Sequence, residues 1–251
     1  MPHRTRGPIS LQSFSLGDML RCGVEIRRVA ADAASMEASA NAVVTYLHGV
    51  LQDPESGRPS CVLLRCFVTL PYGSLPAELQ AVARDAAGDT PLADATRCLV
   101  LLATAGDRPE WNDRASSQGH RAIPLPSPEV VEQAPMIARM MQQMGVDLGA
   151  LLGGGAAPEA ERTYNVFYVP DAAGSEHIPE QEEFVRPNGI RSVIGFGGLL
   201  QEEFFVVVLF SREPVPEDTA TRFRNIALDA RIALLKHERR EIFEPAVAGD
   251  G

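Results

Sequence analysis

Two strongly apolar runs near the C-terminal end of the chain predict a β-hairpin that is followed by a helix. Residues 189–196 and 204–210 are rich in β-branched and aromatic side chains, and a Gly-containing break separates them. Runs of this kind around such a break are typical of paired strands. Glu217 and Asp218 stand ahead of a helical run over residues 219–235, where acidic side chains favour the positive end of the helix dipole. The upstream chain must supply the elements that cover these three.

Further apolar runs predict the rest of a sheet. Residues 60–70 and 98–105 are apolar almost throughout, so we expect two central strands that are covered on most of both faces. Arg65 is the only charged residue in the first of these runs. Shorter runs at 121–125 and 164–169 predict two more strands.

Apolar residues at helical spacing predict helices at about residues 15–30, 32–51 and 75–87. Ser15 followed by Asp18 fits a capping pattern at the start of the first helix. The link to the second helix is rich in alanine and contains no proline, so one long bent helix remains an alternative.

A fourth helical pattern begins after Ser127 and carries a dense group of methionines. Pro135 lies inside this pattern, so the helix is expected either to kink there or to begin there. Flexible thioethers suit both core packing and an adaptable apolar pocket, and the two roles are compatible. The methionines are Met136, Met140, Met141 and Met144.

The order of these elements predicts an α+β fold with a mainly antiparallel central sheet of five or six strands. We expect the first, second and last helices to form a terminal bundle on one face of the sheet. A helix and long loops should cover the other face, where a ligand cavity is expected. We interpret residues 15–240 as a single domain between flexible tails at 1–14 and 241–251.

Charge and composition argue against several classes of partner. Lys and Arg total 23 against 33 Asp and Glu, which gives a net charge of −10 and an isoelectric point of about 5.0. Phosphate binding needs concentrated positive charge, so we expect no nucleic-acid partner. No apolar run approaches the roughly 18 residues that span a bilayer. Because no secretory signal is expected either, we predict a cytoplasmic protein with no membrane partner.

The cysteines provide an alternative hypothesis, a thiol-dependent redox enzyme. Cys22, Cys61, Cys66 and Cys98 lack the spacing of a metal site, so reduced thiols are expected. Cys61 and Cys66 are an odd number of residues apart in one strand and should point to opposite faces. Cys98 is the cysteine expected nearest to a pocket rim. Since no catalytic motif is present, we predict no metal site, no catalytic residue and no enzyme activity.

The run that contains Arg191 and Ser192, the strand over 204–210, the following Ser211 and Arg212 and the closing helix together resemble the end of a GAF domain. In that family a strand with Ile-Arg-Ser precedes its hairpin partner, and a terminal helix packs back onto the sheet. The chain departs from the family in having glycines where a proline is usual after the Arg-Ser strand. The resemblance implies small-molecule sensing, with no particular ligand or cofactor.

The candidate ligand site is drawn from aromatic, methionine and histidine side chains around the expected cavity. His120 is either an exposed loop residue or a ligand contact, and the second role includes haem ligation because neutral imidazole binds iron. Trp111 either walls the pocket or caps the sheet edge. The eight candidates are Phe67, Trp111, His120, Met141, Tyr164, Phe167, Phe196 and Phe205.

The last helix carries a second, narrower apolar stripe that needs a cover of its own. This stripe consists of Leu228, Ile232 and Leu235. Either the first helix or a second copy of the chain could cover it, and GAF domains commonly pair through terminal helices. We therefore predict a homodimeric sensory domain that binds a small apolar or cyclic molecule. Ligand entry would shift loops 106–126 or 170–188, and the terminal helices would relay the change to a downstream signalling protein.

Overall fold

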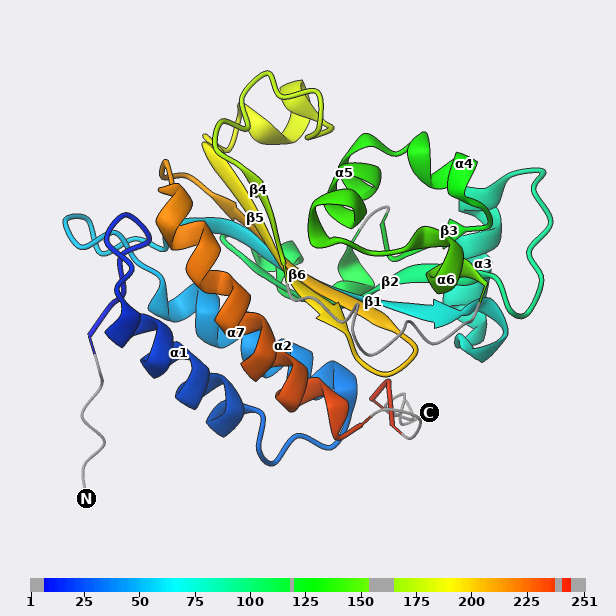
Figure 1. Ribbon diagram of the computed structural model, residues 1–251, viewed down its shortest axis with the longest axis horizontal. Coiled ribbons are helices and arrows are strands. Elements are labelled where there is room, and N and C mark those ends of the chain that lie inside the picture. The colour runs from blue at the N-terminus through cyan, green and yellow to red at the C-terminus, as the bar shows by residue number, and fades with distance from the viewer. Residues whose placement is uncertain (1–6, 118–119, 154–164, 238–240, 245–251) are drawn as a thin grey trace.

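A six-stranded antiparallel sheet separates two layers of the protein (Figure 1). The computed structural model describes residues 7–117, 120–153, 165–237 and 241–244, and within them the strand order is β3-β2-β1-β6-β5-β4. Every neighbouring pair is antiparallel, which confirms the predicted fold class. The strands are β1 (Cys61–Pro71), β2 (Arg97–Gly106), β3 (Ala122–Leu125), β4 (Val166–Val169), β5 (Ser192–Leu199) and β6 (Phe204–Ser211).

The helices cover the two faces of the sheet differently (Figure 1). α1, α2 and α7 pack side by side on one face, as predicted for the terminal bundle, whereas α4, α5 and α6 lie on the other. α3 packs against β3 at the sheet edge. The helices are α1 (Leu16–Val29), α2 (Met36–Val50), α3 (Ala77–Ala87), α4 (Pro128–Glu132), α5 (Pro135–Met144), α6 (Leu148–Leu152) and α7 (Glu217–Leu235).

Local signals in the sequence set the starts of the first two helices. Ser15 and Asp18 form the predicted capping box, because the side chain of each accepts the backbone amide of the other at 3.1 Å. α2 begins separately, where the Ser35 hydroxyl accepts the Ala38 amide at 3.0 Å. The intervening residues 30–35 form turns and bends, so the alternative of one long bent helix is wrong.

The core beneath the terminal helices is organised around Phe223 of α7. Its ring stacks on Phe14 with centroids 5.1 Å apart and lies 5.4 Å from the ring of Phe196 on β5. Phe205 on β6 belongs to the same core, and all four aromatic side chains are fully buried. Aromatic rings in this arrangement bury a large area and add edge and stacking contacts. The terminal helices are therefore held tightly to the sheet.

The segment before α1 is packed against this core. Ile9 and Leu11 are buried, and Ile9 bridges to Leu51 in a parallel pair, with its amide donating to the Val50 carbonyl at 2.8 Å. The flexible tail that the sequence predicted over residues 1–14 is therefore wrong for the part from Ile9 onward. Burying two large aliphatic side chains outweighs the Pro- and Arg-rich composition that suggested a loose tail.

The predicted C-terminal tail is likewise docked where the structure describes it. The carbonyls of Glu241 and Ile242 accept the backbone amides of Met36 and Glu37, both at 2.8 Å. These amides belong to the first turn of α2, whose N–H groups have no partner inside the helix. A flexible tail is therefore the wrong description of residues 241–244.

One carboxylate joins this docked segment to the loop that follows β2. The Arg114 guanidinium donates to both oxygens of Glu37, from Nε at 2.5 Å and Nη2 at 3.2 Å. The Glu244 amide donates to the same carboxylate at 3.0 Å, and Arg114 also lies over the Phe243 ring at 5.2 Å. Both charged side chains are largely buried, so this two-pronged ion pair is well shielded from water. We call these four residues the Glu37 junction.

The helical pattern after Ser127 forms two helices, and the second begins at Pro135. α4 stops at Glu132, and α5 starts at Pro135, whose missing amide hydrogen is harmless at the first helical position. Gly145 ends α5 in a left-handed conformation, with φ of 68°. α5 is therefore a short, independently oriented helix that carries its methionines across the sheet.

The β5–β6 hairpin depends on a glycine at a close approach between the strands. Gly197 pairs with Val206, and a β-carbon at Gly197 would overlap the carbonyl oxygen of Phe205. Only a residue without a side chain allows the strands to approach in this way.

We expect Gly197→Ala to lower the free energy of unfolding by about 2 kcal/mol or more, because overpacking beside backbone atoms cannot be relieved by a rotamer change. The matched control is Gly49→Ala in α2, where an added β-carbon meets nothing within 4 Å. That change should raise stability by about 0.5–1 kcal/mol, since alanine favours a helix. Denaturant unfolding followed by circular dichroism measures both, and equal stability of Gly197→Ala and wild type would contradict the prediction.

Candidate functional site

A cavity of about 420 Å³ lies between the sheet and α5, on the face opposite the terminal helices. This volume falls in the range of roughly 300–1,000 Å³ that is typical of small-molecule sites. Phe67 of β1, Leu99 of β2 and the pair Val208 and Phe210 of β6 form its floor, and all four are buried. They share one face of the sheet because side chains alternate along a strand. We call this space the apolar cavity.

The walls of the apolar cavity come from α5 and from the segment that precedes β5. α5 contributes Met136, Ile137 and Met140, and the opposite wall contains Ile178 and Phe184. Unbranched thioether side chains can adapt to different ligand shapes. Two of the four clustered methionines thus line the cavity, while the other two pack in the core behind it.

A second, polar cavity of about 360 Å³ adjoins the first. It is lined by Glu110, Trp111, Ser116 and Ser117 from the loop after β2, and by Leu63 of β1. Four residues line both cavities and therefore mark the place where the two spaces meet. These shared residues are Arg65, His120, Glu180 and Phe184.

Aromatic contacts fix the wall between the polar cavity and the sheet. The Trp111 ring meets Phe184 edge-on at 5.9 Å, and Phe184 meets Phe210 edge-on at 5.2 Å. The Arg108 guanidinium lies over the Trp111 ring, 4.6 Å from its centre. Trp111 therefore walls a pocket, which was one of the two roles predicted for it.

Arg65 is the charged group at the meeting point of the two cavities. Its Nη2 donates to the Ser117 hydroxyl at 3.3 Å, whereas its buried Nε has no hydrogen-bond partner in the described part of the chain. Burial lowers the pKa of Arg65, and the negative charge of Glu180 partly opposes this effect. Thr104 faces Arg65 directly across β1 and β2, and its buried hydroxyl also lacks a partner among the described residues.

His120 and Glu180 bracket the guanidinium in strained backbone. They are the two non-glycine residues with positive φ in the described chain, at 52° and 55°. His120 lies where the two cavities meet, and desolvation of its ring and the positive charge of Arg65 lower its pKa. Such strain at two neighbouring positions is typical of a functional loop, and here both loops meet at Arg65.

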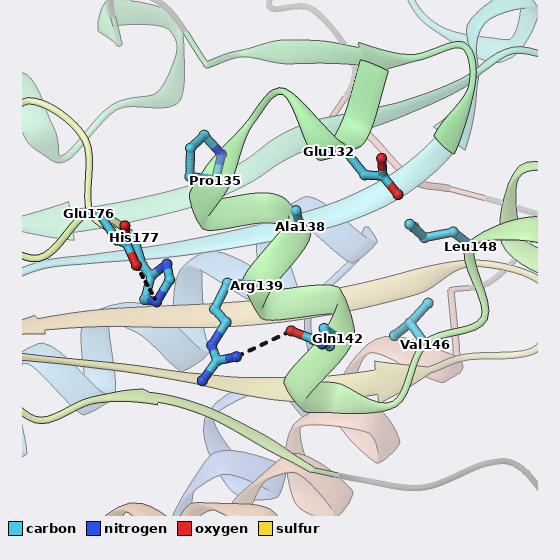
Figure 2. Close-up of a pocket in the computed structure, with 9 residues that line it drawn as sticks. All are labelled: Glu132, Pro135, Ala138, Arg139, Gln142, Val146, Leu148, Glu176 and His177. Carbon is cyan, nitrogen blue, oxygen red and sulfur yellow. Dashed lines mark hydrogen bonds and ion pairs between the residues drawn. The ribbon is translucent and has the colours of Figure 1, made fainter. Parts of the chain in front are cut away.

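A third hollow, of about 740 Å³, lies beside α5 and is lined by the nine residues drawn in Figure 2. Pro135, Ala138, Arg139 and Gln142 project into it from α5, and Arg139 donates to Gln142 at 3.2 Å. None of its nine lining residues is buried. We therefore assign the candidate site to the smaller apolar cavity, whose floor is buried, with its polar neighbour.

The structure gathers only some of the predicted site residues. Phe67 and His120 line the apolar cavity and Trp111 lines the polar one. Met141 and Phe167 are buried in the core on the same side of the sheet and are not among the cavity-lining residues. Tyr164 lies outside the described residues.

Phe196 and Phe205 are corrections to the predicted site. Both side chains point into the core beneath the terminal helices, on the opposite face from both cavities. Residues that sequence analysis did not place at the site include Arg65, Ser117 and Phe184. For Arg65 a signal was present, because a lone charge within an apolar central strand needs a reason to be there.

The thiols are buried on the helix side of the sheet. A register shift between Cys61 and Leu63 adds one residue to β1 and brings both side chains into the same core, so the prediction of opposite faces is wrong. Cys98 is buried there as well and does not reach a pocket rim. Burial raises the pKa of Cys22 and Cys98 to about 11 and that of Cys66 to about 12, and it also raises that of Cys61.

These thiols therefore hold their protons at neutral pH, which argues against a thiolate nucleophile. Among the described residues, no group of three or more His, Cys, Asp or Glu side chains is arranged to hold a metal ion. No helix in the described ranges is long and apolar enough to cross a membrane.

Comparison with known proteins finds similar solved structures at low sequence identity. The chain matches no protein-family model and no curated protein. It is similar to the GAF domain of a phosphoenolpyruvate-protein phosphotransferase from Coxiella burnetii, with a TM-score of 0.45 and 13% identity over 87% of this chain and 93% of that one. It is also similar to a phycoerythrobilin-bound GAF domain from a cyanobacterial phytochrome, with a TM-score of 0.44 and 13% identity over 87% and 95%.

A third similar structure is the phytochrome photosensory core module of Stigmatella aurantiaca, with a TM-score of 0.42 and 9% identity over 90% of this chain and 37% of that one. Because the TM-scores lie below 0.5, no ligand and no residue role is transferred to this chain.

We expect Ellman's reagent to modify none of the four cysteines of the native protein within minutes and all four after denaturation in guanidinium. A Ser56→Cys variant, with its new thiol on an exposed turn, provides the positive control and should react at once. Rapid modification of a native cysteine would show an accessible thiolate and revive the redox hypothesis.

Proposed function

We propose that this protein is a cytoplasmic sensory or regulatory domain that binds a small, largely apolar or cyclic molecule in the apolar cavity. The observation that carries the proposal is the cavity itself, which combines ligand-sized volume with a floor of buried aromatic and aliphatic side chains. Flexible methionines on one wall suit a ligand that is recognised by shape and apolar contact. The proposed role is binding without catalysis.

The sheet supplies a route from the cavity to the terminal helices. On β6, Val208 and Phe210 face the cavity side, while Val207 and Leu209 between them pack in the core under the terminal helices. A ligand that moves β6 therefore acts on both layers through one strand. We propose that this displacement, passed to α7 and α1, is the signal that a downstream protein reads.

We further propose that the terminal helices pair with a second copy of the chain. Large apolar side chains lie exposed at four-residue spacing on both helices, which places each set on one helix face. The ion pair of Arg27 with Asp229 holds the two helices side by side. Leu228 and Ile232 of the second stripe predicted on the last helix are left open to solvent, whereas Leu235 packs against the core. The exposed side chains are Leu16, Leu20, Val24, Leu228 and Ile232.

A neutral aromatic probe tests the binding proposal. N-phenyl-1-naphthylamine, whose fluorescence rises in apolar surroundings, should bind the wild-type protein. Ala134→Phe places a ring at the wall of the apolar cavity and should weaken probe binding about tenfold, given the usual cost of overpacking. Ala138→Phe is the matched control, because Ala138 lines the third hollow, drawn in Figure 2, and it should change affinity less than about twofold. Equal effects of the two variants would contradict the proposed site.

Sedimentation velocity tests the dimer. The wild-type chain should sediment as a dimer, and the double variant Leu20→Glu with Ile232→Glu should raise the dissociation constant at least about tenfold by burying unpaired charge. Val130→Glu is the control, because Val130 is an exposed large apolar residue on α4, away from the terminal helices. A wild-type monomer at tens of micromolar would refute this part of the proposal.

A further inference from the structure

We propose that the ligand is an amphipathic monoacid, whose single anionic oxygen group binds Arg65 while its apolar body fills the apolar cavity. The acidic group is a carboxylate, a sulfonate or a singly charged phosphate ester. This inference rests on the proposed function and names the chemical class that the same site selects.

The first support is the unused hydrogen-bonding capacity of Arg65. Arg114 and Arg212 each pair with a carboxylate within 4 Å, whereas no such partner of Arg65 is found in the described ranges. A buried donor without an acceptor destabilises the folded protein, so such groups usually have a role. The guanidinium edge that carries Nε is the natural partner of an oxyanion, because its N–H groups match two oxygens side by side.

The second support is the position of Arg65 in the sheet. It lies at the middle of β1, between Thr104 of β2 and Val208 of β6, and its side chain lines both cavities. A cation in this place loses much of its hydration, which raises its attraction for an anion. The Thr104 hydroxyl beside it is a second buried polar group without a hydrogen-bond partner among the described residues. An acidic group held here would satisfy the cation and leave the ligand body over the apolar floor.

The surrounding charges restrict the ligand to one negative charge. The whole chain carries a net charge of −10, and the polar cavity also contains Glu110 and Glu180. One guanidinium can neutralise one acidic group, but the two carboxylates repel any further negative charge. A di- or triphosphate is therefore disfavoured, and a monoacid is favoured.

Two probes that share one ring system separate this inference from the proposed function. 1-Anilinonaphthalene-8-sulfonate is N-phenyl-1-naphthylamine with an added sulfonate. The added charge lowers transfer into a purely apolar cavity, so an uncharged site must prefer the amine. With Arg65 in place, the wild-type protein should bind the sulfonate more tightly than the amine, by about tenfold for one charge-assisted hydrogen bond.

Arg65→Met keeps an unbranched side chain of similar length and removes the charge. This variant should lose the preference for the sulfonate, which is read as the ratio of the two affinities measured on the same variant. Arg65→Lys keeps a positive charge and should keep part of the preference, which separates loss of charge from loss of packing. Thermal unfolding of both variants reports whether the fold is intact.

The outcomes distinguish the two hypotheses. Wild-type protein that binds the amine at least as tightly as the sulfonate overturns the monoacid inference without any variant. The same holds if Arg65→Met leaves the ratio of the two affinities unchanged while Ala134→Phe still weakens both probes; the proposed function then stands. If neither probe responds to Ala134→Phe, the proposed binding site itself is wrong.

Discussion

The central strands of this protein are apolar on both faces, and that property forces the rest of the architecture. β1, β2 and β6 bury every side chain except those of Arg65 and Pro71 on one face or the other, so each face of the sheet needs its own cover. Three packed helices, the N-terminal segment and the docked C-terminal residues seal one face. Short helices and long loops cover the other less completely, and the space that they leave is the pair of cavities.

Apolar runs and turn residues were enough to predict the strands, the terminal bundle and the α+β class. The face of the sheet to which each side chain points was harder to predict. Side chains alternate between the two faces along a strand, and a β-bulge inserts one extra residue that shifts this alternation. The register shift between Cys61 and Leu63 places Cys61 and Cys66 on the same face of β1. Phe196 and Phe205 were placed at the cavity because aromatic residues near a glycine hairpin suggested a pocket wall, but only strand register determines their direction.

The polar part of the site was the least predictable from sequence. Arg65 comes from a strand, Ser117 and His120 from one loop and Glu180 from another, so only the tertiary fold brings them together. A sequence pattern relates residues that are close along the chain, and these three segments are far apart in the sequence. What the sequence did show was a single charge in an otherwise apolar strand. Such an exception to the hydrophobic pattern indicates function more reliably than does the abundance of aromatic residues around it.

The Glu37 junction ties distant parts of the molecule to one carboxylate. Arg114 belongs to the loop that also supplies Trp111 and Ser117 to the polar cavity, and Glu244 belongs to the docked C-terminal segment. A displacement of that segment is therefore transmitted to the loop through the short, shielded ion pair of Arg114 with Glu37. Docking of residues 241–244 and ligand binding are in this way linked equilibria. By thermodynamic reciprocity, the factor by which ligand binding changes the docking equilibrium equals the factor by which docking changes the ligand affinity. The C-terminal segment is therefore a place outside the cavity from which the ligand affinity is altered.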